Sequence, residues 1–185
     1  MGFDVRTLEI EGVKLLTLGE FRDSRGALAE TYSKRTLAGV GIDVAFVQDN
    51  QITSFKPGTV RGLHFQAPPH AQCKLVRAVR GAIYAVFVDL RRSSPSYGAH
   101  VGAMLSAANK RQLFAPTGFA HGFMTLEPDT EVVVKFSAHF DAGLAGGVLW
   151  NDPALGIAWP PIDEPVTVSA KDSELPRWSE LASPF

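Results

Sequence analysis

The chain has 185 residues, 45% of them apolar, which is enough for one compact domain with a substantial core over residues 1–185. Eighteen basic and nineteen acidic side chains give a formal net charge of −1 without a basic block, which argues against nucleic-acid binding. The apolar runs are too short to span a membrane, and the first residues lack a signal-peptide core, so we expect a cytoplasmic protein without a membrane partner.

The 17 glycines and 12 prolines separate short apolar segments, a pattern typical of a β-barrel or β-sandwich. One helical turn is predicted near residues 35–39. Strands are then predicted at residues 74–79, 82–90, 99–105, 112–115, 122–126 and 131–137. Another short helix is predicted within residues 173–181, in a Pro-rich tail that we expect to wrap around the barrel. The pattern therefore predicts an all-β, eight-stranded jelly roll with an open mouth and short peripheral helices.

Polar side chains concentrate between residues 46 and 74, in an otherwise apolar chain. If residues 61–66 are extended, Arg61 faces one side of the strand, and His64 and Gln66 face the other. A histidine near Arg61 and Lys74 could remove an acidic carbon proton. It could equally be a half-buried side chain whose hydrogen bonds are satisfied by a neighbour, and the sequence leaves both interpretations open.

Two other features bear on chemistry. His121 lies where a turn enters a strand, and it could be either a capped loop residue or a ligand contact. A metal site in such a barrel needs two histidines one residue apart, whereas His64 and His70 are separated by Pro68-Pro69. We therefore predict no catalytic metal. Cys73 is the only cysteine, which rules out an internal disulfide.

Several separate motifs, in order along the chain, resemble one family. They lie at residues 46–50, 61–66, 74–76, 88–91, 94–95, 118–123 and 150–153. Together they resemble the dTDP-4-dehydrorhamnose 3,5-epimerase family, over roughly residues 21–172. The resemblance implies a cupin-type double-stranded β-helix (jelly roll) without metal or other cofactor, usually a homodimer, that acts on a dTDP-linked 4-keto-6-deoxy sugar.

The resemblance also implies roles for individual residues. His64 matches the base that removes a proton next to the C4 ketone, and Asp172 matches the carboxylate that orients it. Lys74 and Arg61 match cations near the ketone and the developing enolate. The remaining matches are substrate contacts, with the first two reaching the nucleotide across the dimer: Arg25, Glu30, Gln48, Asn50, His121 and Lys171.

Four positions depart from the family pattern. Val134 replaces the tyrosine that acts as the general acid, and Phe140 replaces a second tyrosine. Ala85 stands in place of an aspartate, and Ala145 in place of a glutamate that contacts the nucleotide. The sequence leaves the replacement proton donor open among water and three side chains: His139, His121 and Tyr84.

We therefore expect an isomerase, a nucleotide-sugar epimerase that acts through an enolate in deoxysugar biosynthesis. It would act at C3 and/or C5 of a dTDP-4-keto-6-deoxyhexose. Since a positioned general acid contributes about 10²–10⁴ in rate, the loss of the tyrosine keeps an alternative open. That alternative is a non-inverting or degenerate relative that binds a nucleotide sugar without epimerising it.

Overall fold

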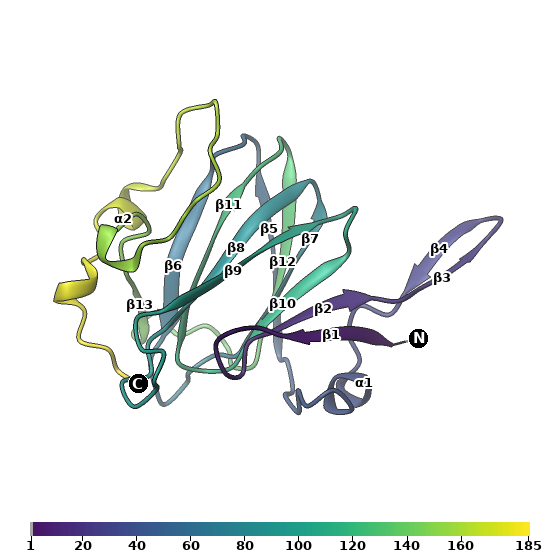
Figure 1. The fold of residues 1–185 in the computed structure, drawn as a ribbon, viewed down its shortest axis with the longest axis horizontal. Coiled ribbons are helices and arrows are strands. Elements are labelled where there is room, and N and C mark those ends of the chain that lie inside the picture. Colours follow the sequence, from purple (N-terminus) through teal and green to yellow (C-terminus); the bar gives the residue numbers. More distant parts are fainter. Residues whose placement is uncertain (1) are drawn as a thin grey trace.

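The computed structural model describes residues 2–185, which form mainly strands in two facing antiparallel sheets (Figure 1). The six-stranded sheet has the spatial order β1 (Phe3–Thr7), β2 (Lys14–Leu18), β10 (Arg111–Ala115), β7 (Lys74–Arg80), β12 (Thr130–Phe136) and β5 (Gln48–Ser54). The five-stranded sheet has the order β13 (Ala145–Gly147), β6 (Val60–Gln66), β11 (Phe119–Thr125), β8 (Ala82–Asp89) and β9 (His100–Ser106). A hairpin of β3 (Glu20–Asp23) and β4 (Gly26–Ala29) projects away from both sheets.

This arrangement is a cupin-type jelly roll, so the predicted fold class is confirmed, although the two sheets of residues 2–185 contain eleven strands and not the predicted eight. The strands predicted from residue 74 onward are present with small shifts at their ends, and residues 61–66 are extended as part of β6. The strands before residue 55 were not predicted. Of these, β3, β4 and β5 lie at the periphery and are mostly exposed, so their sequences lack the apolar alternation that indicates a half-buried strand.

The helices are short and peripheral. The predicted turn near residues 35–39 is α1 (Lys34–Ala38), and the side chain of Ser33 caps it by accepting a hydrogen bond from the Thr36 N–H. The helix predicted within residues 173–181 is wrong in extent. The structure has instead α2 (Ala170–Ser173) and a 3₁₀ turn at Trp178–Glu180, because Pro176 disfavours helical backbone at the residue before it. A further 3₁₀ turn spans Pro153–Leu155.

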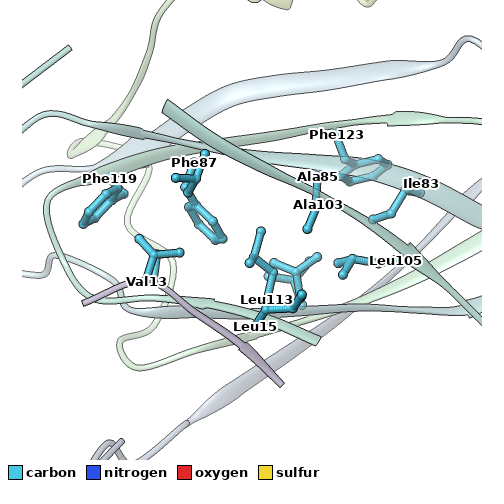
Figure 2. Packing of buried hydrophobic residues seen from close by; sticks show 14 of the residues in the cluster. Val13, Leu15, Ile83, Ala85, Phe87, Ala103, Leu105, Leu113, Phe119 and Phe123 are labelled. Atoms are coloured by element: carbon cyan, nitrogen blue, oxygen red, sulfur yellow. The ribbon is translucent and has the colours of Figure 1, made fainter. Parts of the chain in front are cut away.

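The main core fills the space between the two sheets (Figure 2). Leu15 and Leu113 from the six-stranded sheet face Ile83 and Phe87 from the five-stranded sheet. The labelled side chains of Figure 2 are all buried, so this core contributes much of the fold's stability through apolar area removed from water.

An extra residue in β6 corrects one prediction. The ladder between β11 and β6 pairs His121 with His64 and Phe123 with Arg61, so two steps along β11 correspond to three along β6. Such a bulge shifts the alternation of side chains by one. Arg61 and His64 were predicted to face opposite sides of the strand, but both line the same cavity.

Candidate active site

A cavity of about 620 Å³ opens between the two sheets. Strands β5, β7 and β12 form one wall, β6 and β11 form the facing wall, and the segment around α2 closes one side. Phe123 and Val134 belong to the main core and also line the cavity, so the core forms its inner end. Seven of the residues that the sequence singled out meet here: His64, Asp172, Lys74, Asn50, Arg61, His121 and Lys171.

His64 and Asp172 form a hydrogen-bonded pair, although 108 positions separate them in the sequence. The distance from His64 Nε2 to Asp172 Oδ1 is 2.7 Å, and Asp172 Oδ2 accepts a hydrogen bond of 3.0 Å from the Gly62 N–H. An ionised carboxylate at Nε2 favours the tautomer with the proton on Nε2, which leaves the lone pair on Nδ1. Burial lowers the pKa of His64 despite the opposing effect of Asp172, so the imidazole is neutral at pH 7.

The main chain brings Asp172 to β6. Thr167 exchanges backbone hydrogen bonds with both sides of the β6 entry, donating to Gly58 O at 2.9 Å and accepting from Val60 N at 2.9 Å. The Ser169 side chain then caps α2 by accepting from the Asp172 N–H. The predicted wrapping tail therefore delivers the carboxylate to the histidine.

Lys74 is buried in the cavity, with only 5% of its surface exposed. Its Nζ donates a hydrogen bond of 2.8 Å to the backbone oxygen of His64, and it lies 5.9 Å from the centre of the Phe136 ring. Within residues 2–185, no carboxylate forms an ion pair with this lysine. Burial lowers the pKa of Lys74 to about 7, so both of its protonation states are accessible near neutrality.

His121 lies beside His64 on the neighbouring strand β11. Its ring packs on Phe87 with 4.8 Å between ring centres, and in the described part of the chain its buried Nε2 has no hydrogen-bond partner. Burial holds the pKa of His121 well below its usual range, so the ring is neutral. Nε2 therefore has unused hydrogen-bonding capacity beside the cavity that His121 lines.

Arg61 and Lys171 supply positive charge to the cavity wall. The Arg61 guanidinium is held by Ser54 Oγ and Thr53 O at 3.2 and 3.1 Å. Asn50 lines the same region and accepts a hydrogen bond from the Gln48 amide. Gln48 is not among the lining residues, but its side chain lies next to Asn50 and accepts a hydrogen bond from the Phe140 N–H. Its contribution to the cavity is thus indirect.

Gln66 fixes the rim of the cavity, a role that the sequence did not reveal. Its buried amide donates to the backbone oxygens of His70 and His139 and accepts from the Asp141 N–H. These three bonds tie together two loops far apart in the sequence, and the second loop carries Phe140 at the cavity mouth. A glutamine among pocket residues was visible in the sequence, but its loop partners could not be inferred from spacing.

Several residues of interest lie outside this chain's cavity. Arg25 is at the tip of the exposed hairpin, where it pairs with Asp23, and Glu30 accepts a hydrogen bond from Thr36.

Three of the four positions that depart from the family pattern line the cavity, namely Val134, Phe140 and Ala145, whereas Ala85 is buried in the core. Two candidate donors, Tyr84 and His139, do not line it either, and Tyr84 packs instead against Trp159.

Residues 2–185 contain no group of three His, Cys, Asp or Glu side chains that could hold a metal ion. The helices of this part of the chain are also too short to cross a membrane.

The fold and this cavity define a cupin-type barrel with a histidine–carboxylate pair at its ligand site. A family model described as dTDP-4-dehydrorhamnose 3,5-epimerase matches residues 7–180, and the chain belongs to this family.

Individual relatives agree along nearly the whole chain. The dTDP-4-dehydrorhamnose 3,5-epimerase of Sinorhizobium fredii is 47% identical over 180 residues, covering 97% of this chain and 92% of the relative. The Bacillus anthracis enzyme, solved with TDP and pyrophosphate bound, has a TM-score of 0.91 at 46% identity, covering 95% of this chain and 99% of the other. The Legionella pneumophila 3,5-epimerase, solved with dTDP-4-keto-L-rhamnose, has a TM-score of 0.91 at 34% identity. The match covers 97% of this chain and 94% of the Legionella chain.

Proposed function

We propose that the protein is a nucleotide-sugar epimerase that acts at C3 and/or C5 of a dTDP-4-keto-6-deoxyhexose. The observation that carries the proposal is the His64–Asp172 pair, 2.7 Å apart, in a cavity that also buries Lys74. Family membership and the ligands named for the two solved relatives support the substrate class. They favour an epimerase over a relative that merely binds.

His64 acts as the base in this proposal. Its neutral Nδ1 removes a proton from the carbon next to the ketone, while Asp172 stabilises the imidazolium that forms. Lys74 lies beside the backbone of His64 and stabilises the negative charge that moves onto the ketone oxygen. His121 offers its unpartnered Nε2 to the bound sugar.

The cavity mouth binds the nucleotide diphosphate in this proposal. Arg61 and Lys171 attract the pyrophosphate, and the planar guanidinium of Arg61 suits two oxygens at once. Asn50, positioned by Gln48, contributes a neutral hydrogen-bonding group. Arg25 and Glu30 reach the nucleotide of a partner subunit, which requires a homodimer. The enzyme works in the cytoplasm, in deoxysugar biosynthesis.

The test is to incubate the protein with dTDP-4-keto-6-deoxyglucose in heavy water and to follow C3 and C5 by NMR. We expect deuterium to enter with inversion at one or both carbons. His64→Ala should lower exchange by about 10²–10⁴-fold, because a positioned base contributes that much to the rate. His100→Ala, on β9 outside the cavity, is the matched control. Tight binding without exchange by the wild-type protein would contradict the proposed function.

A further inference from the structure

The two walls of the cavity differ in polarity. The wall of β6 and β11 carries the imidazoles of His64 and His121 and the guanidinium of Arg61. The opposite wall comes from β5, β7 and β12, whose polar lining side chains within residues 2–185 are Asn50 and Lys74. The ammonium of Lys74 reaches across to the His64 backbone oxygen, so it belongs with the polar groups around the base.

An apolar patch covers most of the rest of the opposite wall. It consists of Ile52, Val134 and Phe136, with Phe123 at the inner end of the cavity. Asn50 and Val134 are paired across the β5–β12 ladder, so their side chains point to the same side. Ile52 and Phe136 each lie two residues further along these strands and share that side. Both pack against the main core, which therefore reaches the cavity surface opposite the base.

We propose that the apolar patch selects a substrate whose sugar lacks one of the two free ring hydroxyls of 4-keto-6-deoxyglucose. The substrate is then a dTDP-linked 4-keto sugar that is deoxygenated at C2 or C3 as well as at C6. The sugar must lie against His64 for its proton to be removed, so its other side meets the patch. The inference rests on the proposed function, because it narrows the substrate class of that reaction.

The patch gives a sugar hydroxyl no hydrogen-bond partner. Its four side chains contain only carbon and hydrogen, and the backbone of β12 is paired with β5 on one side and β7 on the other. A hydroxyl directed at the patch would lose its hydrogen bonds to water without replacement, which weakens binding. A methylene at the same place loses no hydrogen bond and gains free energy by leaving water.

The polar wall has partners for the other groups of the sugar. Lys74, beside the His64 backbone, is placed to meet the ketone oxygen. The buried Nε2 of His121 has no hydrogen-bond partner in the described part of the chain, so it suits one hydroxyl. A ketone and one hydroxyl are therefore matched on this side, whereas a second hydroxyl on the far side of the ring is not.

The test compares three dTDP-linked 4-keto sugars in heavy water: the 6-deoxyglucose parent and its 2-deoxy and 3-deoxy analogues. The quantity measured is kcat/KM for deuterium exchange next to the ketone. We expect at least one analogue to exceed the parent by about 10- to 100-fold, the range in which an apolar pocket discriminates against an added hydroxyl.

Val134→Thr tests the patch directly, because it replaces one methyl group by a hydroxyl at the centre of the patch. It should lower the preference for the analogue by at least about tenfold, since the parent's hydroxyl gains a partner. Ile52→Thr makes the same kind of change at the partly buried edge, where it disturbs the core less. Val47→Thr, exposed and outside the lining, is the matched control and should keep the wild-type preference.

The outcomes separate this inference from the proposed function. No exchange with any of the three sugars would refute the proposed function itself. Exchange and inversion of the parent, with no gain for either analogue, would overturn only the selection by the patch. A preference for an analogue that both threonine variants leave unchanged would also overturn it, because the patch would then not be its cause.

Discussion

Two buried charged residues, Asp89 and Lys74, differ in how completely the fold satisfies them. Asp89 is fully buried and accepts hydrogen bonds from the Arg91 guanidinium and from the hydroxyls of Ser94 and Ser96. Lys74 has a single backbone partner. A buried charge with every partner in place stabilises the fold, whereas one with spare hydrogen-bonding capacity indicates a ligand site.

Asp89 gives a prediction about stability and pH. Despite its burial, hydrogen bonds from Arg91, Ser94 and Ser96 lower the pKa of Asp89 to about 2, below its usual 3.8. Because the folded pKa is the lower one, its stabilising contribution is present above pH 3.8 and is lost as the pH falls toward 2. Asp89→Asn should lower the free energy of unfolding at pH 7 by about 2 kcal/mol.

Urea unfolding at a series of pH values would measure this effect. The difference between wild type and Asp89→Asn should shrink between pH 4 and pH 2. Asp129→Asn, in an exposed turn, is the control and should change little. A wild-type protein whose stability does not fall in this range would argue against the assigned role of Asp89.

At the scale of elements, the bulge in β6 is the feature that assembles the cavity wall. It requires Gly62, whose φ of +119° is rarely adopted by other residues, and whose neighbours leave no room for a side chain. A Cβ at this position would lie 2.6 Å from the His121 backbone oxygen. The strand can therefore bring Arg61 and His64 to one face only with glycine between them.

Gly62→Ala should destabilise the protein by about 1–3 kcal/mol through backbone strain alone, with the backbone contact adding to it. Activity should fall more than stability explains, since His64 and the Gly62 N–H that holds Asp172 both shift. Thermal unfolding and steady-state rates below the unfolding transition would measure the two effects. Gly2→Ala, where a Cβ meets nothing, serves as the control. Unaltered activity in Gly62→Ala would show that the bulge does not position the site.

The elements also show where prediction from sequence succeeds. The central strands were predicted because they are short apolar segments between turn residues, and β7 and β8 are indeed buried over most of their length. The bulge in β6 was not predicted, because a strand prediction assumes unbroken alternation of side chains. A glycine alone does not reveal that two steps along β11 correspond to three along β6. The start of α2 could have been predicted from Ser169, which stands at the capping position three residues before Asp172.

For the whole molecule, the polar cluster of the sequence pointed to His64, Arg61 and Lys74, whereas Asp172 came only from the family resemblance. His64 and Asp172 come from distant parts of the chain, and a local pattern cannot predict contacts between them. The departures at Val134 and Ala145 could be read directly, because they are substitutions within matched segments. Their consequence for the lining of the cavity could be seen only once the strands were arranged in space.

The projecting hairpin supports a prediction about assembly. Phe21 and Leu28 are about 60% exposed on it, and β5 is an edge strand with unpaired backbone groups. We expect a dimer in solution, because exposed apolar side chains gain stability when a second copy covers them. The double substitution Phe21→Asp with Leu28→Asp should give a monomer by light scattering.

The same variant should also bind dTDP more weakly, since Arg25 lies at the tip of this hairpin. Met104→Asp, at another exposed apolar position on β9, is the control for added charge. A wild-type monomer that binds dTDP as tightly as the hairpin variant would contradict both the dimer and the role of Arg25.

The docking of the C-terminal segment has a practical consequence. The segment that carries Asp172 is hydrogen-bonded to β6 at Gly58, Val60 and Gly62, and residues on either side of it pack against the buried side chains of Leu63 and Val86. The strand pairing within the two sheets does not include this segment. Molecules in which this segment has come away would keep their strands and lose their chemistry. The folded fraction measured by circular dichroism would then be larger than the fraction of molecules with an intact active site. Active sites should therefore be counted by titration with a nucleotide sugar that binds to them.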